Sequence, residues 1–311
     1  MDTLAALLDG SRAQGAFLMR AVLDPPWSIR VEDEAPLTVV AVARGEAVVV
    51  GSSGEAGLRA GDVAVLRGPD PYVLASAADV VPEVLVGADQ QCRAVDGSDI
   101  RWTLGTTVRT WGNSTAGETV LLIGTYRHPR ETSRRLLAVL PPALVVAATS
   151  WSSPLLPYLG DEIVRDEPGQ EAVLDRLLDL VLIAVLREWL SRPEAGAPGW
   201  YRAGADPVVG PAIRLLYGDP ARGWTVDSLA REVGASRAVL ARRFTELVGQ
   251  SPMAFLTEWR LALAADLLRE PGVTVEHVAR QVGYGTAFAL SAAFKRVRGV
   301  SPAEHRAALA G

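Results

Sequence analysis

The chain has 311 residues, enough for two domains that each bury a core, and 49% of them are hydrophobic. No uninterrupted apolar run reaches the ~18 residues of a membrane span, and the first residues carry no basic segment followed by an apolar stretch, so we expect a soluble cytoplasmic protein. A single cysteine, Cys92, excludes an internal disulfide framework, and the net charge of −5 alone argues against a nucleic-acid binder.

The charge is unevenly distributed along the chain. Residues 206–311 hold 13 Lys and Arg against 10 Asp and Glu, a formal charge of +3, whereas the remainder holds 18 against 26, or −8. This asymmetry is typical of a DNA-binding module attached to an acidic sensing module. Because the surplus is small, we expect affinity to depend on individually placed contacts more than on a broad basic field.

The N-terminal part is rich in short β-branched runs. A short helix and a lead-in strand are predicted within residues 1–24, and strands follow at WSIRV, LTVVAVAR, EAVVVG, DVAVLRG, PYVLA, IRWTL, TVRTWG and ETVLLIGTYR. Glycine, proline and acidic residues separate the runs. This pattern predicts a β-sandwich or a small barrel.

The stretch GLRAGDVAVLRGPDPYVL, residues 57–74, resembles the turn-and-strand signature of cupin barrels. The resemblance covers about residues 8–130 and implies a barrel over residues 1–135. Metal-binding cupins hold their ion with several histidines, but this chain has only His128, His277 and His305, and Pro71-Tyr72 stands where a metal cupin would place a histidine. We therefore expect no metal, no cofactor and no catalytic residues.

A small-molecule pocket is usually apolar with a few polar groups, so aromatic and arginine side chains of the barrel are the candidates for binding an effector. Barrel tryptophans belong to the core more often than to a ligand wall, and no pattern specifies the ligand. Cys92, in the loop-like QQCRAVDG, is either a redox sensor or an ordinary loop residue. The candidate effector-binding residues are Trp27, Arg30, Arg44, Tyr72, Trp102, Arg109, Trp111 and Tyr126.

Helices are predicted from residue 136 onward. The piece LLAVLPPALVV reads as apolar helix broken by its prolines, and residues 154–166 and 170–192 read as a helical hairpin. The hairpin should be buried against the barrel, or against a second subunit through residues 154–190. A Pro- and Gly-containing linker, residues 193–205, ends this helical segment of residues 136–192.

Residues 225–252 recur as residues 274–302, so this part of the chain contains an internal repeat. Each copy predicts a helix, a tight turn at Gly234 or Gly283, and a second helix. Such a unit matches the helix-turn-helix, whose second helix enters the DNA major groove. A long helix, residues 252–269, starts with Ser251 as its cap and joins the copies.

Residues 206–311 resemble the DNA-binding domain of the AraC/XylS family of transcription regulators. The resemblance rests on the repeat, the joining helix, the pair Gly283-Tyr284 and the closing SPAEHR. It implies two helix-turn-helix motifs, at residues 225–249 and 274–299, which bind double-stranded DNA in successive major grooves. It also implies a small-molecule effector, a homodimer, and RNA polymerase as a further partner.

The first recognition helix carries arginines suited to phosphates or to guanine. Arg242 is the expected base reader, and Arg237 and Arg243 are expected to touch phosphate, although each could simply be solvated. In the second motif Ala287 and Ala292 replace the Glu and Arg that the family often has, so this motif should supply affinity and register. The candidate DNA-binding residues are Ser236, Arg237, Ala238, Ala241, Arg242, Arg243, Thr286, Ala287, Ala289, Ser291, Lys295 and Arg296.

The aromatic residues of this domain and the inner faces of its recognition helices are expected to form its core. The expected core residues include Trp224, Val239, Leu240, Phe244, Leu247, Trp259, Tyr284, Phe288 and Phe294.

These predictions combine into an α+β, multidomain, ligand-responsive transcription regulator with an N-terminal cupin-like barrel and a C-terminal all-α double helix-turn-helix. Two alternatives remain open: a DNA-binding protein without an effector, and a metal cupin enzyme fused to a DNA-binding module.

Overall fold

The computed structural model describes residues 17–96, 109–126, 131–151, 153–192 and 198–310. The helix expected near the N-terminus, the strand IRWTL and Trp102 lie outside these ranges. The chain divides into two compact units. The described part of the β-rich unit is residues 17–96, 109–126, 136–151 and 153–192, and that of the helical unit is residues 131–135 and 198–310.

The β-rich unit is built from two six-stranded sheets. The first has the order β10-β1-β11-β3-β6-β12 and the second β5-β4-β7-β2-β8-β9. The strands are β1 (Phe17–Leu23), β2 (Ser28–Val31), β3 (Leu37–Arg44), β4 (Glu46–Gly51), β5 (Gly54–Arg59), β6 (Val63–Arg67), β7 (Tyr72–Ala75), β8 (Val84–Val86), β9 (Cys92–Ala94), β10 (Thr110–Gly112), β11 (Thr119–Tyr126) and β12 (Ala143–Val146).

Long β-branched strands form the middle of the first sheet. β11 pairs antiparallel with β1 on one side and with β3 on the other, from Tyr126 opposite Leu37 to Val120 opposite Arg44. Six consecutive residues of β3 are buried, because both faces of this strand are covered. The core between the sheets surrounds Trp27, which is completely buried. The predicted cupin-like β architecture is thus confirmed.

Several short strands were not predicted or were predicted as something else. β5 and β8 have little β-branched alternation, and Cys92 begins β9 instead of lying in a loop. Ala143–Val146 was expected to be helical, but it forms β12 and pairs antiparallel with β6, from Ala143 opposite Leu66 to Val146 opposite Val63. Its pairing partner lies far away in sequence, which a local pattern does not reveal.

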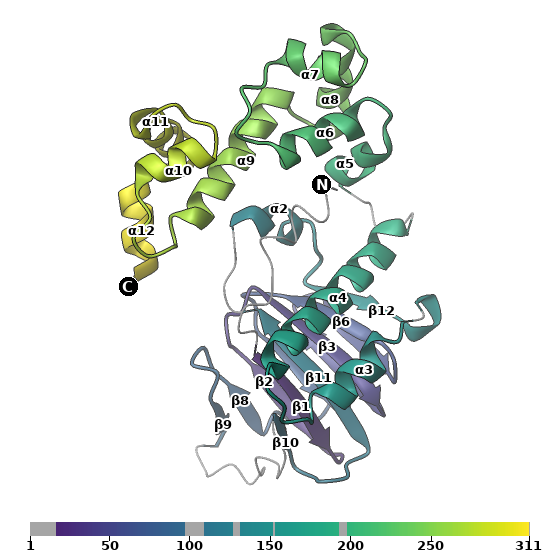
Figure 1. Cartoon of the computed structure of the whole chain (residues 1–311). Coiled ribbons are helices and arrows are strands. Elements are labelled where there is room, and N and C mark those ends of the chain that lie inside the picture. The colour runs from purple at the N-terminus through teal and green to yellow at the C-terminus, as the bar shows by residue number, and fades with distance from the viewer. Residues whose placement is uncertain (1–16, 97–108, 127–130, 152, 193–197, 311) are drawn as a thin grey trace. The chain divides into compact units, whose positions relative to one another are not determined.

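Two helices cover the first sheet, as Figure 1 shows: α3 (Leu155–Glu162) and α4 (Gln170–Ser191). Gly124 of β11 makes room for α4, because a Cβ there would lie 2.4 Å from a methyl group of Leu178. One face of α4 is therefore buried against the barrel, as the first of the two readings of this helix expected. Two shorter elements are η2 (Ala148–Ser150), which belongs to this unit, and α2 (Arg134–Leu137), which spans the boundary between the two units.

The helical unit contains the predicted repeat (Figure 1). Thr225, Ser236, Ser251, Thr274 and Thr286 each cap a helix through a side-chain oxygen, as expected for Ser251. The elements are η1 (Glu131–Ser133), α5 (Gly199–Arg202), η4 (Ala203–Ala205), α6 (Val209–Gly218), α7 (Val226–Glu232), α8 (Arg237–Val248), α9 (Pro252–Leu267), α10 (Val275–Gln281), α11 (Ala287–Arg298) and α12 (Pro302–Ala310). None of the described helices is both long and apolar enough to cross a bilayer.

Most of the expected core residues of this unit are buried, but two are not. Trp224, Leu240, Phe244, Trp259 and Phe294 are buried. Leu247 and Tyr284 are half-buried. Val239 and Phe288, by contrast, are 37% and 83% exposed, so placing them in the core was wrong. Both lie in the first turn of a recognition helix, on the side of the helix that faces solvent.

The two turn glycines both have left-handed backbone but differ in their surroundings. Gly234 has φ +68° with open space around a would-be Cβ, whereas Gly283 has φ +86° and its Cβ would lie 2.7 Å from the Cα and carbonyl oxygen of Ala221. Only the second glycine is therefore required for close packing as well as for its conformation.

We predict unequal effects of alanine at these two glycines. Gly234→Ala should cost about 1 kcal/mol of unfolding free energy, the strain of a left-handed alanine. Gly283→Ala should cost about 3 kcal/mol or more, since overpacking against backbone is added. Calorimetric melting of both variants measures the difference, and equal losses of Tm would contradict the close approach to Ala221.

Candidate nucleic-acid interface

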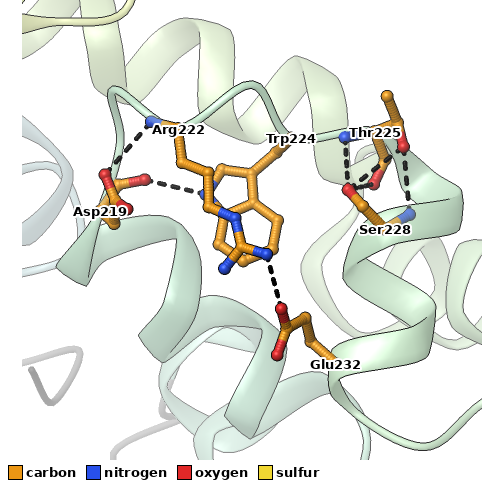
Figure 2. Close-up of polar contacts among 6 residues, drawn as sticks. All are labelled: Asp219, Arg222, Trp224, Thr225, Ser228 and Glu232. Atoms are coloured by element: carbon orange, nitrogen blue, oxygen red, sulfur yellow. Dashed lines mark hydrogen bonds and ion pairs between the residues drawn. The ribbon is translucent and has the colours of Figure 1, made fainter.

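A polar network fixes the start of the first helix-turn-helix (Figure 2). The Trp224 indole N–H donates to the Asp219 carbonyl at 2.8 Å, and the Arg222 guanidinium lies 4.1 Å from the Trp224 ring centroid. Arg222 also pairs with Glu232 of α7 at 2.6 Å. Thr225 and Ser228 form a reciprocal capping box at the start of α7. These contacts hold α7 on the end of α6 and thereby orient α8.

The outer face of α8 presents most of the residues expected there. Arg237, Ala238 and Arg242 are exposed, while Ala241 and Arg243 are half-buried. Ser236 serves as the helix cap, accepting from the Val239 backbone N–H at 3.3 Å. The small side chains of Ala238 and Ala241 leave the backbone of α8 accessible around Arg242, which suits close approach to a base edge.

Each arginine of this face has an acidic partner in the free protein. Arg237 pairs with Asp227 and Arg242 with Glu246, both at 3.1 Å between mostly exposed side chains. Exposed pairs of this kind contribute little stability, so a phosphate or a guanine can replace the carboxylate at small cost.

Arg243 is held differently, because it pairs with Asp206, whose side chain is only 10% exposed. Burial tends to raise the pKa of Asp206, but the backbone N–H groups of Val209 and Val208 and the Arg243 guanidinium outweigh it and hold the pKa below its usual value. A carboxylate held ionised by these donors keeps Arg243 in place. This geometry fixes the N-terminus of α6 against α8 and makes Arg243 less available to phosphate than Arg242 is.

The outer face of α11 is small and apolar, with cations at its end. Thr286 caps the helix, and Ala289 beside it is exposed. Ala287 and Ser291 are half-buried, and the backbone N–H of Ala287 donates to Glu276 at 3.0 Å. Lys295 and Arg296 are exposed at the C-terminal end.

Phe288 is the residue on this face that the sequence analysis missed. At 83% exposed it is the most exposed of the large hydrophobic side chains in the described part of the chain. The sequence did contain a signal for this position. Phe288 lies three residues before Ser291, a half-buried residue of the outer face, and residues three apart lie on the same face of a helix. An exposed aromatic ring in the first turn of a recognition helix is suited to contact thymine methyl groups.

The two motifs are joined through α9 and through Arg260 on it. The Arg260 guanidinium donates to the Pro220 carbonyl at 2.7 Å and to the Arg222 carbonyl at 2.8 Å. It also faces the Tyr284 ring at 5.9 Å. The loop that leads into the first motif is thereby tied to the turn of the second, next to the close approach of Gly283. The two recognition helices are held in a fixed arrangement within this unit.

The β-rich unit contains a cavity of about 50 Å³ between its two sheets. Its lining is almost entirely apolar, with Asp33, Gln90 and Thr125 as the polar exceptions, and Gln90 donates to Asp33 at 3.3 Å. Burial raises the pKa of the Cys92 thiol, which therefore stays protonated and poorly reactive near neutral pH. The lining residues are Phe17, Met19, Ile29, Val31, Asp33, Tyr72, Leu74, Val86, Gln90, Cys92, Trp111, Ile123 and Thr125.

Of the candidate effector-binding residues, Tyr72 and Trp111 line this cavity. Trp27 is buried in the core beside it. Arg30 pairs with Glu32, and Arg44 donates to the carbonyls of residues 116 and 117.

The remaining two described candidates face the α4 helix. Arg109 donates to Gln170 at 2.6 Å, and Tyr126 donates to Asp179 at 3.2 Å. Across the residues that the structure describes, no group of three or more His, Cys, Asp or Glu could hold a metal ion.

Comparison with known proteins agrees with this architecture. A family model described as Cupin matches residues 2–191, and one described as Helix-turn-helix domain matches residues 229–308. A Streptomyces lividans protein named AraC-like transcription regulator is 33% identical over 316 residues, which cover 98% of each chain. The HTH-type transcriptional regulator MtrA of Neisseria gonorrhoeae is 26% identical, again over 98% of each chain. Among solved structures, the DNA-binding domain of AdpA in complex with a target DNA aligns at 33% identity with a TM-score of 0.31, covering 33% of this chain and 93% of that one.

A cupin-like domain followed by two helix-turn-helix motifs defines a DNA-binding transcription regulator. The chain belongs to the AraC-like family of transcription regulators. Its full-length relatives are named as regulators, so it is not an enzyme, and the metal cupin alternative is discarded.

We predict that Phe288 contributes to DNA binding and not to folding. Phe288→Ala should leave Tm unchanged and weaken DNA binding by about 1–2 kcal/mol, part of the value of fully burying a phenylalanine. Phe294→Ala on the same helix is the control: its ring is completely buried, and removing it should cost about 3–5 kcal/mol of stability. Melting curves and gel-shift titrations distinguish the two, and a fall in Tm with unchanged DNA affinity for Phe288→Ala would contradict the assignment.

Proposed function

We propose that this protein is an effector-responsive regulator in which a small apolar molecule in the barrel changes how the DNA-binding units engage an operator. The observation that carries the proposal is the apolar cavity between the two sheets of a cupin-like domain. The effector shifts the population between two arrangements, which requires that it bind one arrangement better than the other. A regulator of this kind acts in the cytoplasm, and RNA polymerase is a further partner.

The cavity lining determines the class of effector. Apolar side chains dominate it, and two of the few polar groups, Asp33 and Gln90, already bond to each other. A charged ligand would lose its hydration without finding a partner, so the lining favours an apolar molecule. At about 50 Å³ the cavity is well below the ~150 Å³ that accommodates benzene, so a larger effector requires flexible lining side chains such as Met19 to move.

DNA recognition is divided between the motifs. Arg242 reads a base from α8, while Ser236, Arg237 and Arg243 of the same motif contact the backbone, and Ala238 and Ala241 permit close approach. In α11, Thr286, Ala287, Ala289 and Ser291 provide an apolar and hydroxyl surface, and Lys295 and Arg296 hold phosphates. The two helices enter successive major grooves, about 34 Å apart on one side of the duplex.

The helical hairpin provides a surface for a second copy of the chain. Val173 and Leu180 are 38% and 47% exposed and lie seven residues apart on one face of α4, while Tyr158 of α3 is 50% exposed. The opposite face of α4 is buried against the barrel. The helix thus has a core face and an exposed face that carries Val173 and Leu180 together with Arg176, and the exposed face forms the dimer contact within residues 154–190.

The division of labour between the motifs predicts different effects of two alanine variants. Arg242→Ala should weaken binding to the preferred duplex by about 1–3 kcal/mol and relax the preference at one base pair. Lys295→Ala should weaken binding to all sequences alike, since it removes a phosphate contact. Titration against a set of single-base-pair variants of the duplex measures both. A uniform loss with Arg242→Ala would show that it is not a base reader.

The cavity predicts which molecules stabilise the full chain. Xenon should raise Tm, and short hydrocarbons or benzene should do so only if lining side chains move, whereas sugars and amino acids should not. Val86→Phe, which fills the cavity, should abolish the shift, while Val50→Phe, on the same sheet but outside the lining, should keep it. Shifts that persist in Val86→Phe would place the binding site elsewhere.

The hairpin surface predicts the oligomeric state. Leu180→Glu should convert a dimer to a monomer in sedimentation, because it buries a charge in the contact. Val81→Glu, at a residue 77% exposed outside the hairpin, is the control and should remain dimeric. A dimer that survives Leu180→Glu would exclude this face.

A further inference from the structure

A segment outside the two helix-turn-helix motifs is docked on the helix that joins them. η1 follows β11 in the sequence, yet its residues belong to the helical unit. The backbone N–H groups of Glu131 and Thr132 donate to the Asp266 carboxylate at 2.7 and 3.1 Å, and the Thr132 hydroxyl donates to it at 2.9 Å. Asp266 lies on α9 and is only 8% exposed. The buried carboxylate therefore receives three hydrogen bonds, all from this one segment.

The same segment reaches the second recognition helix. The Glu131 carboxylate pairs with Arg298, the last residue of α11, at 2.9 Å and with Arg134 at 3.1 Å. The Glu131 and Arg298 side chains are 13% and 18% exposed, so this pair is shielded from solvent far more than the arginine pairs of α8. In this arrangement Arg298 is neutralised, unlike Lys295 and Arg296 on the same helix, which are exposed.

The docking is polar and leaves space beside it. A cavity of about 620 Å³, open to one side, lies between the segment and helices α9, α11 and α12. The segment itself contributes Glu131, Thr132 and Arg134 to its lining. Contacts that rely on hydrogen bonds and ion pairs next to an unfilled groove resemble transient interfaces more than a domain core. The segment is therefore held by interactions that can open without unfolding the unit.

We propose that residues 131–134 form a latch that holds the second helix-turn-helix in a weakly binding state and opens when DNA is bound. The latch lies a few residues beyond β11, whose Ile123 and Thr125 line the barrel cavity, and its continuation through α2 leads back to the β-rich unit. An effector that shifts β11 therefore also moves the latch, because only a few residues of the chain connect the two. Opening frees Arg298 to contact a phosphate. The inference rests on DNA binding by this unit and adds a regulatory contact to the proposed function.

The test compares binding of the full chain and its variants to a duplex that the wild-type chain selects from random-sequence DNA. Glu131→Gln removes the charge that holds Arg298, and Asp266→Asn weakens the acceptor that holds η1. Both should bind about threefold tighter or more near physiological salt, and for Glu131→Gln the plot of log K against log salt should steepen by about 0.9, the value of one added phosphate contact. Adding Arg298→Met to Glu131→Gln should remove the extra slope.

The matched control is Glu46→Gln, which removes one negative charge from an exposed pair in the β-rich unit and should change nothing. Equal or weaker binding by both latch variants at unchanged Tm would overturn the proposal. So would a gain that survives Arg298→Met in full, because the effect would then be general electrostatics.

Hydrogen exchange of the wild-type chain gives an independent measurement if a variant does not fold. The amides of Glu131 and Thr132 should exchange slowly in the free protein and faster in the DNA complex. Amides that are unprotected in the free chain, or that slow further on DNA, would overturn the latch. If the chain selects no duplex at all, DNA binding itself fails, and protection in the free chain still decides whether the latch exists.

Discussion

The arrangement of the DNA-binding unit depends on one close approach, that of Gly283 to Ala221. A side chain at residue 283 would overlap the backbone of the loop that leads into the first motif, and Arg260 ties that loop to α9 through two carbonyls. The turn of the second motif therefore packs directly on the beginning of the first. This contact, together with α9, sets where α11 points relative to α8. Two recognition helices that each make few DNA contacts can then bind one duplex together as a rigid unit.

Charge pairing is the second constraint on function. The helical unit carries only a small positive surplus, and in the free protein Arg237, Arg242, Arg243 and Arg298 each contact a carboxylate. These carboxylates differ in how exposed they are to solvent. The difference determines how readily each arginine can leave its carboxylate and bind DNA. Arg237 and Arg242 exchange partners at little cost, whereas Arg243 and Arg298 are held by shielded carboxylates. In a unit with so small a positive charge, few arginines are free to bind any phosphate, so nonspecific DNA binding is weak and specific contacts count for more.

The sequence predicts this unit well because its signals are local. Thr225, Ser236 and Ser251 cap helices from within their own segments, and the left-handed turns require glycine at the positions where the repeat has it. Ser301 and Glu304 likewise bond to each other at the start of α12. Exposure of Phe288 was not predictable from its residue type, since a phenylalanine in an amphipathic helix is ordinarily core. Its exposure is set by how α11 packs within the unit, which residue type alone does not specify.

The β-rich unit was predictable in class but less so in detail. Strands with strong β-branched alternation, such as β3 and β11, were predicted, whereas β8 and β12 exist through partners distant in sequence. The cavity was beyond prediction for the same reason, because its lining comes from strands of both sheets and only Tyr72 and Trp111 of the candidate residues reach it. The docking of η1 on Asp266 joins residues more than a hundred positions apart, and no sequence pattern predicted it.

The central claim is that the two helix-turn-helix motifs bind DNA as one rigid unit. Hydroxyl-radical footprinting of the full chain on its selected duplex tests this most directly. For each bound unit we expect two protected segments on one side of the duplex, with centres separated by about one helical turn, ~10 base pairs. Protection by only one motif, or two segments whose separation varies from site to site, would contradict it.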